Sequence, residues 1–268
     1  MKSDATISDQ FFEVDGLNVR YRVGGEGPPL LLVQGIGASL ELWGTLPDHL
    51  DGFTTIAFDH PGSGLSETPP QLVHMRHFAR VAAELLEHLG YDEADVLGFS
   101  FGGMVAQELA HAYPERVRRL VLVATSCGWG GVPAGPAALA AIATPYRYYS
   151  PSYFQLVAPV LYGGSAGRDS VQVQEQADAR RRHPPSVGGY YTQLFAAWSW
   201  SSLQWVNELT CPALVLCGSD DPITPIVNSH ILAGELAHGE LLEVPEGGHL
   251  FLVESAAELA PRVIDFLT

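Results

Sequence analysis

Short apolar runs rich in β-branched residues recur along the chain, with the length of β-strands rather than of helices. They predict eight strands, at residues 11–15, 18–23, 30–33, 54–58, 94–98, 119–124, 213–218 and 240–244. The first two alternate in polarity around Gly16-Leu17, which predicts a hairpin with one exposed face. The later runs are nearly continuously apolar, as expected for strands that are covered on both faces.

Helical patterns separate the later strands. Apolar residues spaced three and four apart predict helices at 72–89, 101–111, 225–236 and 255–267. Regular alternation of strand and helix is typical of an α/β fold. We therefore predict a doubly wound, mostly parallel eight-stranded sheet flanked by helices.

The alternation stops between residues 128 and 206, where no clear strand pattern occurs and half of the aromatic residues gather. We expect a helical lid inserted after the sixth strand, dividing the α/β core into residues 1–127 and 207–268, with the lid at 128–206. Most of its aromatic rings would form a small core of the lid itself. Trp129, Tyr191 and Trp198 are the candidates for rings that face a substrate.

Composition narrows the function classes. A hydrophobic content of 47% suits a single domain with a large core, and a net charge of −16 argues against binding nucleic acid or anionic lipid. The one basic run, Arg180-Arg181-Arg182, is interpreted as a solvated helix face. No apolar run is long enough to span a membrane or to form a secretory signal, so we expect a cytoplasmic protein. The three cysteines lack the pairing or spacing of disulfides or metal sites, and no metal is expected.

The segment Gly98-Phe99-Ser100-Phe101-Gly102 lies between a predicted strand and a predicted helix. Gly-x-Ser-x-Gly in this context is typical of a nucleophile elbow, a sharp turn that exposes the serine hydroxyl. Glycines allow the incoming strand and the outgoing helix to pass close together, and the helix directs its positive end at the serine. The pattern predicts Ser100 as a nucleophile.

A serine hydroxyl needs a general base, which must itself be oriented by a third group. His249 lies in a glycine-rich loop between the last predicted strand and the final helix, which suits a base. Asp220 and Asp221 both follow the strand at 213–218, and Pro222 stiffens the turn after them. The residues alone leave these two acids almost equally suitable.

Acyl transfer also needs two donors for the oxyanion of the tetrahedral intermediate. The backbone N–H of Phe101, directly after the nucleophile, is one candidate. The other is the N–H of Ile36 in the loop Gln34-Gly35-Ile36-Gly37-Ala38, where glycines let the backbone approach a substrate. Gly35 is a further candidate for substrate contact. Alternatively, the glycines serve only the dihedral angles of a tight connection.

These motifs, in this order, resemble the α/β-hydrolase superfamily over essentially the whole chain. Five segments further resemble the intracellular depolymerases of medium-chain-length poly(3-hydroxyalkanoates), at 35–43, 158–164, 189–196, 220–225 and 248–252. The second and third lie in the expected lid, where the superfamily varies most. The resemblance implies hydrolysis of ester bonds in an aliphatic polyester by Ser100, Asp221 and His249, because hydrolases of this fold place the acid before the proline.

Two departures from that family flank the expected oxyanion site. Gln34 stands where asparagine or histidine is expected, and Phe101 stands where tryptophan is usual. Two other hypotheses therefore stay open: a carboxylesterase, lactonase or thioesterase for a small acyl substrate, and a receptor on this fold without enzyme activity. Neither an organic cofactor nor a metal is implied. Acyl chain length, granule association and oligomeric state are left undetermined.

Overall fold

The computed structural model describes residues 8–164 and 169–268. Within them, an eight-stranded sheet has the order β1-β2-β4-β3-β5-β6-β7-β8. Its strands are β1 (Gln10–Val14), β2 (Leu17–Gly25), β3 (Pro29–Val33), β4 (Thr54–Phe58), β5 (Ala94–Phe99), β6 (Val117–Val123), β7 (Ala213–Gly218) and β8 (Gly239–Val244). β1 and β2 pair antiparallel, β2 is also antiparallel to β4, and all other pairs are parallel. This sheet confirms the predicted fold class.

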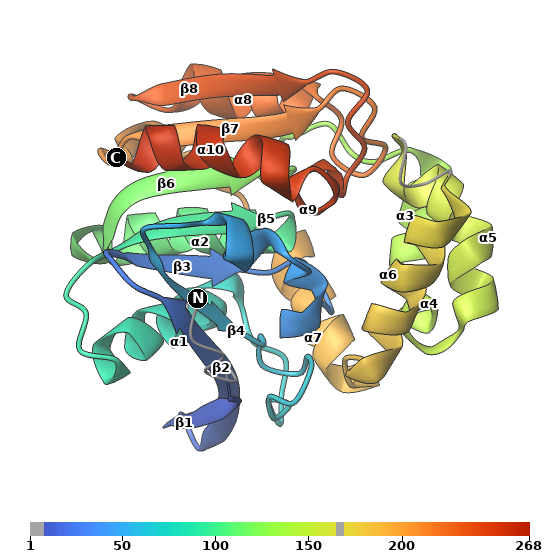
Figure 1. Ribbon diagram of the computed structural model, residues 1–268, viewed down its shortest axis with the longest axis horizontal. Helices are drawn as coiled ribbons and strands as arrows, with labels where there is room; N and C mark the ends of the chain where they lie inside the picture. The colour runs from blue at the N-terminus through green and yellow to red at the C-terminus, as the bar shows by residue number, and fades with distance from the viewer. Residues whose placement is uncertain (1–7, 165–168) are drawn as a thin grey trace.

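Helices of the described residues occupy the connections between strands (Figure 1). Those of the core are α1 (Met75–His88), α2 (Phe101–Ala112), α8 (Val227–Glu235), α9 (Phe251–Glu254) and α10 (Ala256–Leu267). The helix predicted at 255–267 is present as α10, and a separate short helix, α9, precedes it. Ser255, with φ −110° and ψ 35°, lies outside the helical range and separates the two. The extra turn of α9 places Phe251 and Leu252 in the core.

The first hairpin turns one residue earlier than the polarity pattern predicts. Its turn is Asp15-Gly16, with φ of 53° and 72°, while Leu17 already pairs with Val14 in the sheet. Positive φ at both central residues is the type I′ turn that Asp-Gly favours. Leu17 belongs in the strand because its side chain is buried.

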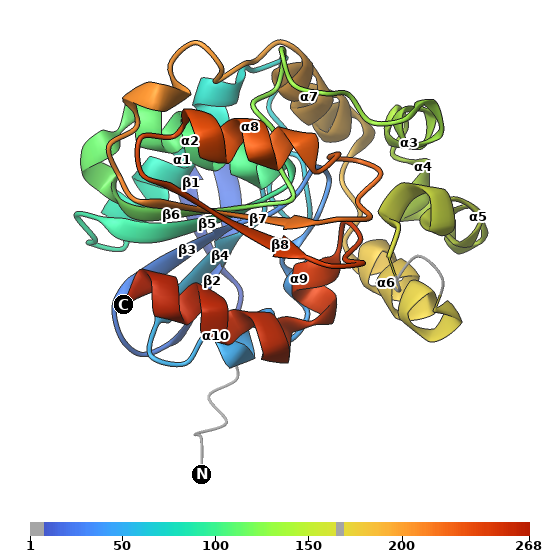
Figure 2. The same ribbon diagram turned by 90° about the horizontal axis from the view of Figure 1, so that it is seen from above.

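Both faces of the central strands are covered, as their apolar runs predict. Along β3, Leu31 and Val33 pack into one hydrophobic cluster, while Leu30 and Leu32 pack into another on the opposite face. Helices α1, α2 and α8 cover the first face, and α10 covers the second (Figure 2). The strands therefore form a rigid layer whose carboxyl ends can position side chains.

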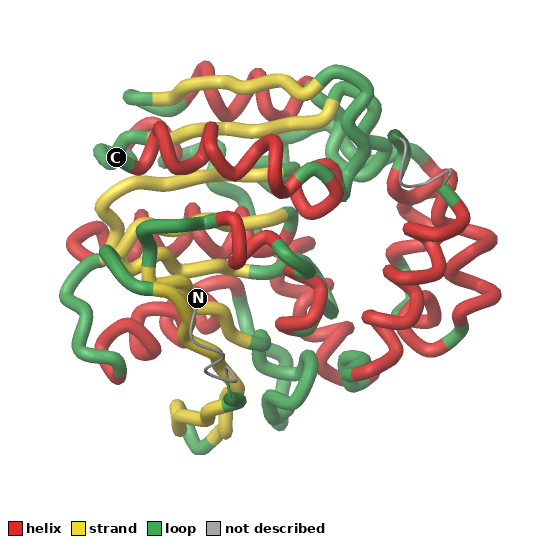
Figure 3. Tube along the Cα trace, in the orientation of Figure 1, coloured by secondary structure: helices red, strands yellow, loops and turns green. Residues whose placement is uncertain are grey.

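Among the described residues of the segment expected to be a lid, between β6 and β7, five α-helices occur: α3 (Pro136–Ile142), α4 (Tyr146–Tyr149), α5 (Pro151–Tyr162), α6 (Ser170–Arg182) and α7 (Val187–Trp198). Figures 1 and 3 show α3 to α6 as a group beyond the carboxyl ends of the parallel strands, with α7 nearer the sheet. Ser186 caps α7, since its hydroxyl accepts a hydrogen bond from Gly189 N at 2.9 Å.

Candidate active site

Ser100 occupies a strained turn between β5 and α2. Its φ of 55° and ψ of −118° are unfavourable for a residue with a side chain, and such strain is concentrated at functional sites. A Cβ on Gly98 would lie 2.4 Å from Gly102 O, and one on Gly102 would lie 2.0 Å from Val33 O. Both glycines are therefore required by close backbone approach, as the motif predicts.

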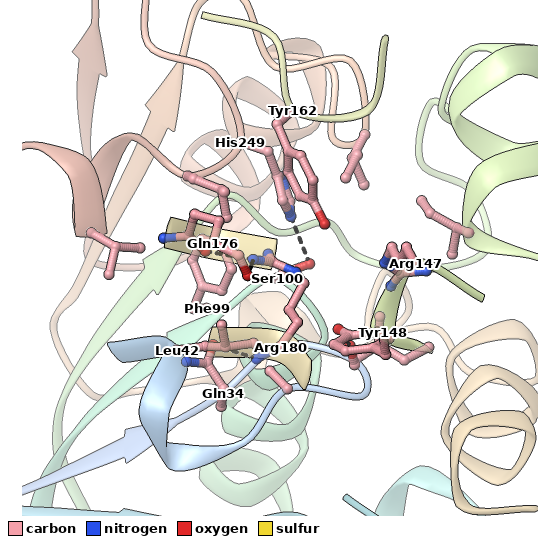
Figure 4. A pocket seen from close by; sticks show the side chains of 17 residues that line it. Gln34, Leu42, Phe99, Ser100, Arg147, Tyr148, Tyr162, Gln176, Arg180 and His249 are labelled. Carbon is pink, nitrogen blue, oxygen red and sulfur yellow. Dashed lines mark hydrogen bonds between the residues drawn. The ribbon is translucent and has the colours of Figure 1, made fainter. Parts of the chain in front are cut away.

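The side chains of Ser100, His249 and Asp221 lie in one line of hydrogen bonds. His249 Nε2 is 3.0 Å from Ser100 Oγ, and His249 Nδ1 is 2.7 Å from Asp221 Oδ2 (Figure 4 shows the serine contact). Because an ionised carboxylate only accepts, Nδ1 carries the hydrogen and Nε2 is left to accept the serine proton. His249 and Asp221 are both buried, which shields this line from water.

The two neighbouring acids have different partners. The carboxylate of Asp221 accepts hydrogen bonds from Ile223 N at 2.8 Å and Thr224 N at 3.0 Å, in addition to its contact with the imidazole. Asp220 instead accepts from Gly164 N at 2.9 Å, at the end of α5. The geometry therefore brings Asp221, and not Asp220, to the histidine.

The two expected oxyanion donors come from two different segments next to Ser100. Phe101 is the first residue of α2, and Ile36 lines the same pocket as Ser100. In the described part of the chain, neither N–H donates a hydrogen bond to another protein group. Within those residues, neither amide is used by the protein itself, as the expected role of oxyanion donor requires.

Residues of the core hold the loop that carries Ile36. His60 Nε2 lies 2.8 Å from Gln34 O, and the Gln34 side chain accepts a hydrogen bond from Gly35 N at 2.8 Å. Complete burial lowers the pKa of His60 to about 4, so the ring is neutral and donates through Nε2. Gln34, one of the two departures from the family pattern, therefore braces its own loop.

Two side chains of the lid hold the same loop. Tyr148 Oη on α4 donates to Ile36 O at 2.5 Å, and Gly37 N donates to Gln193 Oε1 on α7 at 2.7 Å. Gln193 also donates to Pro61 O and to Ser63 Oγ, so one buried amide joins α7 to two loops of the core. The position of the Ile36 amide thus depends on the lid as well as on the sheet.

Asp59 supports the site from a distance. Its buried carboxylate lies 3.2 Å from Arg20 Nη1 and accepts from Leu40 N at 2.7 Å and Leu65 N at 2.9 Å. These contacts join the turn after β4 to the segment after the oxyanion loop. They leave Asp59 with a supporting role in the fold rather than a place in the line of Ser100 and His249.

A pocket opens over Ser100 and His249 between the core and the lid (Figure 4). Gly35 lines it, as expected for a substrate contact. Trp129, Tyr191 and Trp198 do not line it, and their exposed fractions are 72%, 43% and 72%. Two of them are neighbours, since Trp129 Nε1 donates to Trp198 O. The aromatic residues of the pocket lining are instead Phe99, Tyr148 and Tyr162.

Two charged residues of the pocket lining escaped prediction. Arg147 on α4 and Arg180 on α6 are each only 4% exposed. The interpretation of the run 180–182 as a solvated face is wrong for Arg180, although it suits Arg181, whose side chain is 62% exposed. The signal in the sequence is the spacing of Val173, Ala177 and Arg180, which share one helix face, and the first two are buried.

Two general features concern metal-binding clusters and membrane-spanning helices among the described residues. Across residues 8–164 and 169–268, no group of His, Cys, Asp and Glu side chains is arranged to hold a metal ion. The helices described in the same ranges are all too short or too polar to cross a membrane.

Residues 28–169 match the model of the alpha/beta hydrolase fold family. Since this match covers more than half of the sequence, the chain belongs to the α/β-hydrolase family. It is 40% identical over 259 residues to the poly(3-hydroxyalkanoate) depolymerase of Ectopseudomonas oleovorans, covering 95% of this chain and 90% of that protein. That similarity confirms the resemblance found in the sequence motifs.

Two further proteins show how widely the fold is shared. The 2-hydroxymuconate semialdehyde hydrolase of Pseudomonas sp. strain CF600 is 30% identical, over 94% of this chain and 91% of that protein. The crystal structure of the enol-lactonase from Burkholderia xenovorans LB400 superimposes with a TM-score of 0.83, at 22% identity, over 96% of this chain and 99% of that one. The second likeness is one of fold alone.

Proposed function

We propose that this chain is a serine ester hydrolase that acts on poly(3-hydroxyalkanoate) or on its oligomers. The observation that carries the proposal is the line of hydrogen bonds from Ser100 through His249 to Asp221, at the base of a pocket. The 40% identity to a poly(3-hydroxyalkanoate) depolymerase supports the substrate class.

In the first half of the reaction, the ester carbonyl oxygen binds to the N–H groups of Ile36 and Phe101. Ser100 Oγ attacks the carbonyl carbon while His249 Nε2 takes its proton, and Asp221 stabilises the imidazolium that forms. The two amides stabilise the negative charge on the tetrahedral oxygen. His249 then gives its proton to the alcohol oxygen, and the ester C–O bond breaks to leave an acyl-serine.

In the second half, water replaces the alcohol. His249 removes a proton from the water as its oxygen attacks the acyl-serine, and the same two amides again bind the oxyanion. Return of the proton to Ser100 Oγ releases the carboxylic acid. Apart from the ester and water, every group used in this proposed cycle belongs to the chain.

The apolar part of the pocket suits an alkyl side chain. Leu42, Ile142, Ile223, Leu250 and Val253 line it around the serine. Such a surface favours a medium-length aliphatic chain over a polar acyl group, because burial removes apolar area from water.

An exposed pair of tryptophans supports contact with an insoluble polymer. Trp129 and Trp198 are hydrogen-bonded neighbours, and both are mostly exposed. Exposed apolar patches often mark interaction sites. We assign to this pair the contact with the polyester surface, and with it an association with storage granules.

A comparison of substrates tests the proposal. The protein and its Ser100→Ala variant would be assayed on an emulsion of medium-chain polyester, on soluble oligomers and on short p-nitrophenyl esters, lactones and thioesters. We expect release of 3-hydroxy acids from polymer or oligomers by the wild type only. Hydrolysis confined to the small compounds would contradict the substrate class, and unchanged activity of Ser100→Ala would contradict the mechanism.

The surface contact needs a separate arm of the same assay. Replacing Trp129 and Trp198 together by alanine should slow hydrolysis of the emulsion several-fold, because surface binding weakens, and leave the soluble ester rates unchanged. Equal rates on the emulsion would remove the tryptophan pair from the proposal.

A further inference from the structure

Two buried cations lie in the lid wall of the pocket. Arg147 and Arg180 are each 4% exposed, and both line the cavity that holds Ser100 (Figure 4). Taking a guanidinium out of water without a counter-ion is costly, so buried arginines normally face a carboxylate or phosphate. Two buried positive charges in a pocket otherwise suited to alkyl groups therefore indicate an anionic ligand.

The protein supplies hydrogen-bond partners for only some of the N–H groups of each guanidinium. Arg147 Nη1 donates to Tyr190 Oη at 2.6 Å and to two backbone carbonyls, and Arg180 Nη1 donates to Gln176 Oε1 at 2.5 Å and to its carbonyl at 3.1 Å. The Nε of both residues is buried and has no partner in the part of the chain that is described. Within the same part, neither arginine forms a salt bridge with a carboxylate.

Aromatic rings hold the flat faces of both groups. Each guanidinium carbon lies 4.7 to 5.2 Å from two ring centres, Arg147 over Tyr148 and Tyr190, and Arg180 over Phe154 and Tyr162. Rings that cover the faces leave the unused N–H groups at the edge. The edge is the side on which a guanidinium binds a carboxylate through two parallel hydrogen bonds.

Glu254, the core acid whose pKa is affected by Arg180, does not replace such a ligand. The positive charge of Arg180 acts to lower the pKa of Glu254 on α9, yet Glu254 Oε1 is buried without a partner in the described residues. Burial raises the pKa of Glu254 to about 7, against the opposing effect of Arg180. Near neutral pH it is therefore only partly ionised and does not neutralise the lid wall.

We propose that Arg180, together with Arg147, binds a free carboxylate of the substrate, so that the preferred substrates are oligoesters cleaved next to their carboxyl end. This inference rests on the proposed function. In a chain of 3-hydroxy acids, the terminal unit carries its carboxylate a short carbon chain away from the ester oxygen. One pocket can therefore hold the ester carbonyl against the core wall and the carboxylate against the lid wall. An ester bond in the interior of a polymer offers no such charge.

The test compares two substrates that differ by one charge, the linear dimer of 3-hydroxyoctanoate and its methyl ester. We expect the wild type to favour the free acid in kcat/KM by about tenfold or more, the usual effect of a hydrogen bond to a charged group. Arg180→Gln should abolish most of this preference, and Arg180→Lys should retain part of it through the charge. Arg181→Gln, at the exposed neighbour, is the matched control and should keep the preference.

A binding measurement provides a readout apart from turnover. In Ser100→Ala protein, calorimetry should show 3-hydroxyoctanoate binding that weakens about tenfold or more when Arg180→Gln is added. Thermal unfolding checks that each variant is folded, and Arg180→Lys replaces Arg180→Gln if the latter is not. Equal wild-type kcat/KM on acid and methyl ester, or equal losses on both in the Arg180 variant, would overturn the inference and leave the proposed function intact. Failure to hydrolyse either compound would instead count against the proposed function.

Discussion

The two walls of the pocket are built differently. The core wall carries Ser100, Asp221 and His249 on short connections at the carboxyl ends of β5, β7 and β8, of which β5 and β7 are fully buried. The lid wall carries Tyr148 and Arg180 on helices that share hydrophobic clusters with core residues and also make polar contacts, such as the bond from Tyr148 Oη to Ile36 O. Under the proposed function, chemistry that tolerates little displacement is placed on the sheet, and substrate selection on helices outside it.

The largest effect expected on the core wall separates the two adjacent acids. Asp221→Asn should keep the geometry but favour the wrong tautomer of His249, and should lower kcat by about ten-thousandfold. Asp220→Asn, the matched control, changes the carboxylate that accepts from Gly164 N rather than the one bonded to His249 Nδ1, and should retain most of the activity. Steady-state kinetics on a soluble ester would decide the matter. Similar losses in both variants would mean that the turn itself, rather than one carboxylate, is required.

A smaller effect is expected where the walls meet. Tyr148→Phe removes the hydroxyl that holds Ile36 O, and a displaced Ile36 amide binds the oxyanion less well. We expect kcat to fall by about ten- to a hundredfold, less than the loss of a whole oxyanion donor, with KM nearly unchanged. Tyr149→Phe removes a hydroxyl bonded to Pro185 O, outside the pocket lining, and is the control.

The outcome for Tyr148 would sharpen the comparison between the walls. A change in KM alone would make Tyr148 a substrate contact and nothing more. Unchanged kinetics would mean that the core contacts of the loop, through His60 and Gln34, are sufficient to hold Ile36.

The same contrast explains what the sequence could predict. The elbow at Ser100 is a local pattern, and its strand and helix flanks are visible as neighbouring periodicities. His249 and Asp221 could be found because strand ends converge at one edge of a parallel sheet. Asp221 could be separated from Asp220 only by resemblance, since the direction of each carboxylate depends on backbone donors such as Thr224 N.

The place of the lid in the chain could be predicted, but its contacts with the core could not, for a physical reason. The bond between Gly37 N and Gln193 Oε1 joins residues 156 positions apart, and nothing local marks either partner. The burial of Arg180 depends on which face of α6 packs toward the core, and composition suggested the opposite. Trp129 and Trp198 were chosen for their chemistry, yet the structure exposes them and lines the pocket with Tyr148 and Tyr162.

The smallest expected effect concerns Glu254, where the core wall faces Arg180 of the lid. Because burial raises the pKa of Glu254 to about 7, the folded protein binds more protons than the unfolded chain between about pH 4.5 and 7. Stability contributed by this group therefore falls as pH rises through that window and stays lower above it. Glu254→Gln removes the ionisation, so the variant should exceed the wild type in unfolding free energy by about 1 to 2 kcal/mol at pH 8, allowing for partial exposure, and by much less at pH 4.5.

Urea unfolding of both proteins at the two pH values measures this difference, with the exposed Glu258→Gln on α10 as control. A gain for Glu254→Gln that is the same at both pH values would show that packing, and not charge, sets the effect. Adding Arg180→Gln should enlarge the gain at pH 8, because Arg180 is the group that favours the ionised form of Glu254. An unchanged gain would mean that the two walls are electrostatically independent, and the charge of Arg180 would then be felt only by what enters the pocket.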